Sequence, residues 1–143
     1  MAAPNTEPVF TRVADIQWVE NITAANTTFD LTSGTSYLAY TADATNGGYV
    51  TRARIKANPT NNFAATVVRF WLNNGAATTT AANSALIGEL TFAATTASAT
   101  AAQIDHDFPL GIAMPPGYRI YVTIGTAPTS PAKMTVTVFG GKY

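Results

Sequence analysis

Hydrophobic and polar residues alternate with a period of two along much of this chain, which is typical of strands with one buried face. The alternation is clearest in residues 49–56, 86–92 and 118–124. Further strands are predicted at residues 9–13, 16–22, 37–41, 63–72 and 134–139. No stretch has the spacing of an amphipathic helix. We therefore predict an all-β fold, an antiparallel β-sandwich, with a jelly roll as the leading topology.

Residues 49–56 illustrate how the faces are assigned. One face carries Tyr49, Thr51, Ala53 and Ile55, which we expect to point into the core, and the other carries Val50, Arg52, Arg54 and Lys56. The turn-forming residues Asn46, Gly47 and Gly48 precede this strand. They predict a hairpin that joins it to the strand at residues 37–41.

The organisation between strands indicates one domain. Two alanine- and threonine-rich tracts, residues 76–82 and 93–103, lack periodicity and are predicted to be loops. Prolines at positions 4 and 8 favour an extended N-terminal arm. We assign residues 1–15 to this arm, which could lie on a neighbouring subunit, and residues 16–143 to the sandwich.

Charge is scarce and balanced. Only 11% of the residues are charged, with eight basic and eight acidic side chains, against roughly 25% in an ordinary soluble domain. No net field exists to attract nucleic acid or an acidic membrane. The chain has no cysteine, no recognisable export signal and no apolar run long enough to span a bilayer. We expect neither nucleic-acid nor membrane partners, and a surface that other proteins cover.

The single histidine lies in the one local cluster with possible chemistry, Asp105, His106 and Asp107. In a strand the two aspartates would project to the face opposite the histidine, so the three could not converge on one ion. We interpret the cluster as a polar loop. The remaining acids are scattered along the sequence. The sequence contains no phosphate-binding glycine loop, and its serines lie outside any recognisable nucleophile motif. We expect no catalytic residue, no metal, no cofactor and no enzymatic activity.

The residues that we single out are candidates for an interface. Arg52, Arg54 and Lys56 lie about 6 to 7 Å apart along one strand face, where they could pair with carboxylates of another subunit. Phe10 and Arg12 are candidates from the arm. Six aromatic residues could instead form a sugar-binding platform, although strand aromatics are more often core or subunit contacts. These six are Trp18, Tyr37, Tyr40, Trp71, Tyr118 and Tyr121.

Four segments resemble small virion structural proteins of tailed bacteriophages and prophages, in particular capsid decoration, or cement, proteins. The segments are residues 26–34 (NTTFDLTSG), 67–75 (VVRFWLNNG), 94–100 (ATTASAT) and 114–123 (MPPGYRIYVT). The resemblance spans roughly residues 26–143, and its motifs mark strands and turns rather than chemistry. It implies a β-sandwich subunit of a homotrimer on the outer surface of a phage head, in contact with the major capsid protein.

That resemblance gives a first hypothesis, a non-enzymatic protein that stabilises the capsid. The alternative is a receptor- or glycan-binding module of a phage fibre or tail tip, because jelly rolls also host sugar sites.

Overall fold

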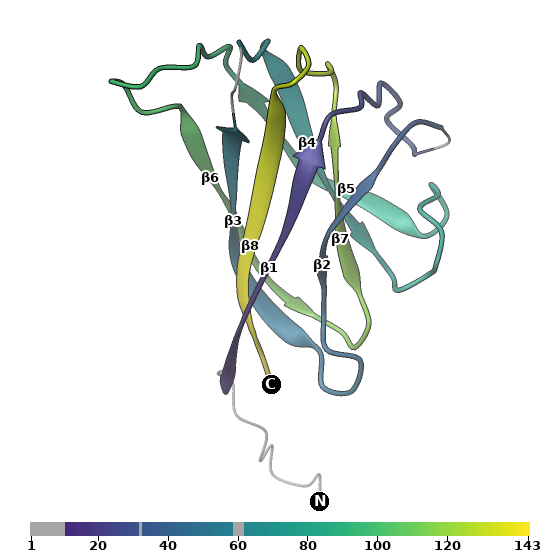
Figure 1. Ribbon diagram of the computed structural model, residues 1–143. Helices are drawn as coiled ribbons and strands as arrows, with labels where there is room; N and C mark the ends of the chain where they lie inside the picture. The colour runs from purple at the N-terminus through teal and green to yellow at the C-terminus, as the bar shows by residue number, and fades with distance from the viewer. Residues whose placement is uncertain (1–10, 32, 59–61) are drawn as a thin grey trace, which may run out of the picture.

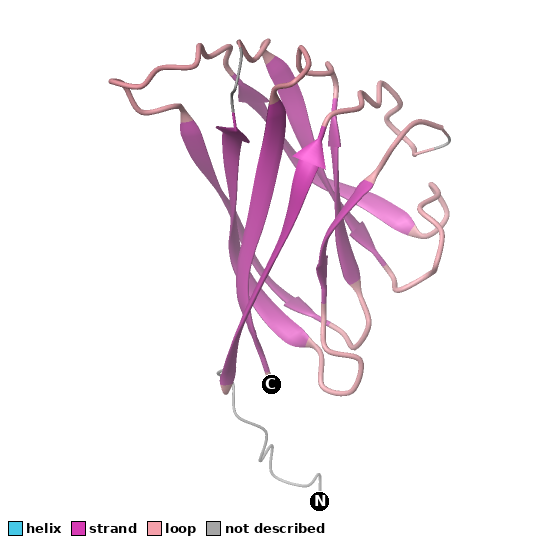
Figure 2. Cartoon of the chain, in the orientation of Figure 1, coloured by secondary structure: helices cyan, strands magenta, loops and turns pink. Residues whose placement is uncertain are grey.

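The computed structural model describes residues 11–31, 33–58 and 62–143, and in these residues it contains eight strands and no helix (Figures 1 and 2). The strands are β1 (Val13–Ile22), β2 (Tyr37–Thr41), β3 (Gly48–Asn58), β4 (Thr66–Asn73), β5 (Ser84–Phe92), β6 (Asp105–Met114), β7 (Arg119–Ile124) and β8 (Lys133–Lys142). The described part of the chain contains no helix that could span a membrane.

The strands form two antiparallel sheets that pack face to face (Figure 1). Sheet A has the order β1-β8-β3-β6, and sheet B has the order β2-β7-β4-β5. Of the successive connections, only β4 to β5 stays within one sheet. This confirms the predicted all-β sandwich. The strand order is compatible with a jelly roll, which stays a prediction.

The core lies between the sheets and is built from alternate residues of the central strands. Its largest side chains include Tyr40, Phe63, Phe70 and Phe92, each at most 1% exposed. The rings of Phe70 on β4 and Phe108 on β6 stack with their centroids 4.7 Å apart. Aromatic contacts therefore join the two sheets as well as filling the space between them.

One lateral edge of the sandwich is closed by polar side chains from β1. The Gln17 amide donates to the Thr41 carbonyl at 2.8 Å, and its oxygen accepts from the Thr41 N–H at 2.9 Å. The buried Tyr40 hydroxyl donates to Asp15 at 3.0 Å. Because β2 is an edge strand, the Gln17 side chain supplies at Thr41 the two backbone hydrogen bonds that a further strand would otherwise make there.

The assignment of faces in residues 49–56 was partly wrong. Ala53 and Ile55 are buried as predicted, but Val50 is buried and Tyr49 and Thr51 are exposed. The pairing of β3 with both of its neighbours shifts register between Val50 and Arg52. Such a bulge adds one residue and reverses the face of every residue before it.

Two other predictions were also wrong. The turn at Asn46, Gly47 and Gly48 forms, with Gly47 donating to the Asp43 carbonyl at 3.1 Å, but β2 and β3 belong to different sheets. The connection therefore crosses the sandwich instead of closing a hairpin. Residues 105–107 begin β6 rather than forming a loop. The predicted opposite-face placement is confirmed, because His106 packs edge-on against Phe92 while both aspartates are exposed.

The arm and the sandwich meet near the start of β1. Strand β1 begins at Val13, within the 1–15 segment assigned to the arm, and the Arg12 N–H donates to the Lys142 carbonyl at 2.8 Å. Residues 1–10, including Phe10, lie outside the described residues. The role of the arm stays a prediction.

Candidate functional site

The outward faces of the two sheets differ in what the chain itself covers. On sheet B, a loop covers two large aromatic residues. Trp71 and Tyr121 point outward from sheet B, yet they are only 2% and 8% exposed and form a cluster with Leu31 from the β1–β2 loop. The β1–β2 and β4–β5 loops meet there, where the Ser36 and Thr79 hydroxyls lie 2.9 Å apart.

A buried arginine ties the same loop to sheet B. The Arg69 guanidinium pairs with Glu89 at 3.2 Å, donates to the Asn26 carbonyl at 3.4 Å and lies 4.2 Å from the centroid of the Phe29 ring. Its aromatic and ionic partners are all within this chain. Apolar side chains around this contact stay exposed, namely Phe29 (65%) on the loop, Leu38 (44%) opposite Tyr121 and Leu86 (40%) opposite Trp71.

The outward face of sheet A is open and carries a mixed surface. On the edge strand β1 it exposes Ile16 (50%) and Trp18 (61%). On β3 it exposes Arg52, Arg54 and Lys56. Large apolar side chains beside planar cations are typical of protein interfaces rather than of solvated surfaces. We take this face of sheet A as the candidate functional site.

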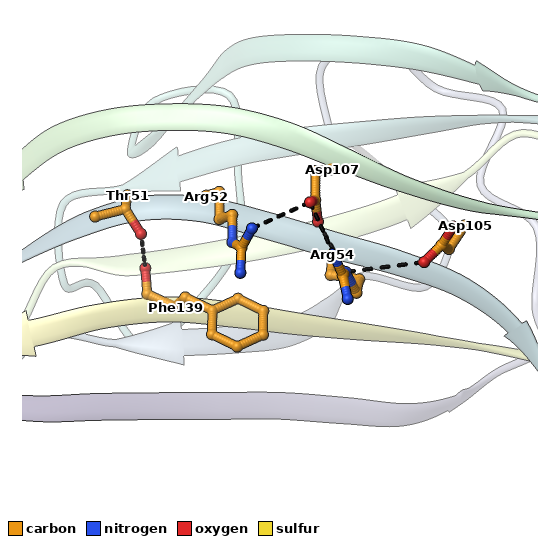
Figure 3. A network of polar contacts seen from close by, with 6 residues as sticks. All are labelled: Thr51, Arg52, Arg54, Asp105, Asp107 and Phe139. Carbon is orange, nitrogen blue, oxygen red and sulfur yellow. Dashed lines mark hydrogen bonds and ion pairs between the residues drawn. The ribbon is translucent and has the colours of Figure 1, made fainter.

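The three predicted basic residues do lie on one face, but two of them already have acidic partners (Figure 3). Arg54 binds both oxygens of Asp107, with two contacts of 2.9 Å, and Arg52 donates to the same carboxylate at 3.1 Å. Asp105 lies 4.0 Å from Arg54. We call these four residues the ionic cluster. It is a cross-strand network, because β3 pairs with β6 at Arg54 and Asp107.

The electrostatics of the ionic cluster follow from this geometry. The hydrogen bonds from Arg54 hold the pKa of Asp107 below its ordinary value of 3.8, with Arg52 adding to the effect. The same carboxylate raises the pKa of Arg54. Arg52 also stacks on Phe139, with its guanidinium 4.7 Å from the ring centroid. Hydrogen bonds to Asp107, and for Arg52 the ring of Phe139, therefore hold both guanidinium groups on this face of sheet A.

Lys56 has a different environment. Its ammonium makes one long hydrogen bond, 3.4 Å to the Gln103 carbonyl, and it has no acidic partner among the described residues. It lines a surface pocket of about 410 Å³ together with Arg54, Ala57, Asn58, Gln103, Thr135 and Thr137. None of the described residues that line this pocket is acidic. Lys56 is the one basic residue of the predicted trio whose charge is not balanced within the described chain.

The other sequence candidates are placed elsewhere. Arg12 is exposed beside Lys142, whereas Lys56 lies opposite Thr135 near the other end of β8. Of the six aromatics, Tyr40, Trp71 and Tyr121 are buried, and only Trp18 is largely exposed. They cannot form one platform. The described residues hold no group of three or more side chains that could bind a metal ion.

Sequence reasoning missed Ile16, Phe139, Asp105 and Asp107 as parts of this face. The signal was present in the alternation of residues 105–108, but Pro109 and the assignment of a loop concealed the strand. Comparisons with protein-family models, with curated proteins and with solved structures found no match.

Proposed function

We propose that this protein is a non-enzymatic structural protein of a tailed-phage virion, which binds the outer surface of the capsid as a homotrimer and stabilises the head. Its partners are then further copies of itself and the major capsid protein, and it acts through contacts rather than chemistry. Many small interfaces acting together would resist expansion of the head.

The observation that carries the proposal is the amount of apolar surface that the folded chain leaves exposed. Sheet A leaves Ile16 and Trp18 half or more exposed, and Leu38 and Leu86 of sheet B are 44% and 40% exposed. An exposed apolar face on a chain with only 11% charged residues supports a role in a permanent assembly. The resemblance of the sequence motifs to decoration proteins supports the same role.

The first test is the mass of the protein in solution, by size-exclusion chromatography with light scattering. A homotrimer gives about 45 kDa, three times the 15.0 kDa chain. The second test is cosedimentation with empty, expanded heads of the phage or prophage that encodes this chain. We expect saturable binding and greater resistance of the heads to heat or osmotic shock. Heads that neither bind the protein nor gain stability from it contradict the proposal.

One observation favours a second candidate, a glycan- or receptor-binding module. Trp18 presents a largely exposed ring, and flat rings of this kind stack on the apolar faces of sugars. A glycan array and a host-cell binding assay separate the two functions. Binding to cells without binding to heads supports the receptor module, and the reverse supports the capsid protein.

A further inference from the structure

We propose that the protein associates with itself by packing the β1 edge of one subunit on the β3 region of the next, with Trp18 against Arg54 and Glu20 against Lys56. The inference deepens the proposed function, because it assigns the surface that closes the homotrimer. Its occupant is a second copy of this chain, and both halves of the contact lie on the outward face of sheet A.

The register of sheet A brings the two halves to matching heights. Trp18 on β1 and Arg54 on β3 both lie opposite Thr137 of β8. Ile16 and Arg52 both lie opposite Phe139. A rotation about an axis parallel to the strands keeps every residue at its height. In a ring closed about such an axis, residues of one row therefore lie level with their row partners in the neighbouring subunit, as the proposed contact requires.

The bulge in β1 adds a third matching row. The pairing of β1 with β8 shifts between Val19 and Ile22, so Glu20 and Asn21 both lie level with Thr135. Lys56 of β3 lies opposite the same Thr135. Because β8 separates β1 from β3, Glu20 and Lys56 are about 10 Å apart within one sheet. They do not pair within the chain, but a neighbour's Glu20 reaches Lys56 at the same height.

The charges on this face are complementary once the ionic cluster is set aside. Among the described residues, the exposed Glu20 side chain has no hydrogen-bond or ion-pair partner, and the Lys56 side chain has only its long bond to a carbonyl. Both arginines are balanced by Asp107 and Asp105. Lys133 of β8 also lacks an acidic partner among the described residues, but its ammonium donates to the Asn21 side chain at 2.7 Å. Besides Lys133, the face carries one unbalanced acid on β1 and one unbalanced base on β3, which a head-to-tail contact between identical subunits requires.

The apolar half of the contact has a receiving surface of suitable chemistry. The pocket beside Lys56 is lined by Arg54, Thr135 and Thr137, and it lies in the row that Trp18 shares. An indole inserted there contacts the Arg54 guanidinium, which two hydrogen bonds to Asp107 hold in position. Ile16 is placed to cover Phe139 and Arg52. Aromatic residues and arginine are the residues that dominate the energetics of such interfaces.

A charge exchange tests the pairing. We expect Glu20→Lys and Lys56→Glu each to weaken self-association about tenfold or more, because like charges then face each other. The double variant should recover the wild-type mass, since the pair is reversed but intact. The neutral variants Glu20→Gln and Lys56→Gln serve as controls for the loss of attraction alone. Single reversals that leave the mass unchanged, or a double variant that fails to recover, overturn the inference.

A fluorescence measurement tests the placement of Trp18 independently. Trp71→Phe leaves Trp18 as the only tryptophan. In the oligomer its emission should lie at shorter wavelength and resist acrylamide quenching, and dilution to the monomer should reverse both. Trp18 emission that is water-exposed in the oligomer overturns the inference.

The outcomes separate this inference from the proposed function. A wild-type protein that is monomeric at all concentrations overturns the self-contact, while binding to heads still tests the capsid role. A trimer that ignores both charge reversals retains the proposed function and overturns the assigned surface. A charge-swap rescue in a 30 kDa dimer, twice the 15.0 kDa chain, supports the contact and contradicts the trimer.

Discussion

At the scale of single residues, Asp107 is the central acid of the ionic cluster, because both arginines hydrogen-bond to its carboxylate. Its pKa is held below 3.8 by hydrogen bonds from Arg54. A carboxyl group with a lowered pKa stabilises the folded state above its ordinary pKa, and the contribution is lost as pH falls through the lower folded-state pKa. Because the cluster is solvent-exposed, its total effect on stability is small.

We therefore expect Asp107→Asn to lower the melting temperature at pH 7 and to have a smaller effect near pH 2, because the wild-type carboxyl takes up a proton as pH falls through its lowered pKa. Thermal unfolding followed by circular dichroism at both pH values measures this difference. Asp105→Asn is the matched control, because Asp105 lies 4.0 Å from Arg54 and should change the melting temperature less. An Asp107→Asn deficit that persists unchanged at pH 2 contradicts an electrostatic role.

Tyr40 provides the opposite pH dependence. Burial of its hydroxyl, its hydrogen bond to Asp15 and the negative charges nearby raise its pKa well above the ordinary value of 10.0. A raised pKa in the folded state gives a contribution that is complete below about pH 10 and is lost as pH rises toward the folded-state pKa.

Tyr40→Phe removes the hydroxyl and this dependence together. At pH 7 we expect a loss of about 1–2 kcal/mol from the free energy of unfolding, since a buried hydrogen bond to a carboxylate disappears. The gap between wild type and variant should narrow at pH 10.5, because Tyr40 then ionises in unfolded wild-type protein only. Urea unfolding at the two pH values gives the comparison, and a gap that widens with pH rules out the assigned cause.

At the scale of strands, Gly88 of β5 controls how closely the two sheets approach. A Cβ atom at this position would collide with the tip of the Phe108 ring, which is stacked on Phe70. The ring could turn away only by breaking the stack that joins β4 to β6. The absence of a side chain at Gly88 is thus a packing requirement between the sheets.

Gly88→Ala should lower the free energy of unfolding by about 1–3 kcal/mol, the usual cost of overpacking a core. Gly125→Ala is the control, because a Cβ atom there meets only neighbours at 3.7–3.9 Å and the backbone conformation suits any residue. That control should change the stability by less than about 0.5 kcal/mol. Equal effects of the two substitutions on the urea midpoint exclude a specific role for the Phe108 contact.

The same scale shows how far the sequence could predict the fold. Alternation located most strands, because each has one face against a dry core and one outside. The alternation gave the wrong faces for the first residues of β3, because the bulge between Val50 and Arg52 reverses them. A bulge depends on the partner strands and leaves no local pattern in the sequence. The alternation also failed at β6, whose Pro109 and Gly111 are unfavourable for a strand interior but tolerable at a sheet edge.

Strand order and cross-strand pairing could not be predicted from the sequence, for a related reason. The turn at Asn46, Gly47 and Gly48 was read correctly, yet a turn does not determine whether the next strand stays in the same sheet. The candidate face could be predicted only in part. Periodicity correctly placed Arg52, Arg54 and Lys56 on one face. It could not predict that the two arginines have an acidic partner and Lys56 has none. That partner, Asp107, is more than fifty residues away in the sequence and meets the arginines only through the register of β3 with β6.

At the scale of the whole molecule, charged and apolar side chains have different roles in the proposed assembly. An exposed ion pair is worth at most about 1 kcal/mol, and at 1 M salt screening acts beyond about 3 Å. Burial of Trp18 and Ile16 does not depend on ionic strength in this way. The proposed pair of Glu20 and Lys56 therefore selects the partner surface, while the apolar side chains provide the affinity.

We consequently expect the mass of the wild-type oligomer, and its attachment to heads, to be unchanged between 0.15 M and 1 M sodium chloride, conditions that shorten the screening length from about 8 Å to about 3 Å. Trp18→Ala should dissociate the oligomer at both concentrations, because its apolar contact is lost. The repulsion created by Lys56→Glu, in contrast, should weaken as salt increases and allow partial reassembly. Light scattering on the wild type, Trp18→Ala and Lys56→Glu across this range of salt concentration tests these expectations. A wild-type oligomer that dissociates at 1 M salt would place the affinity in charged contacts and contradict the division of roles argued from sheet A.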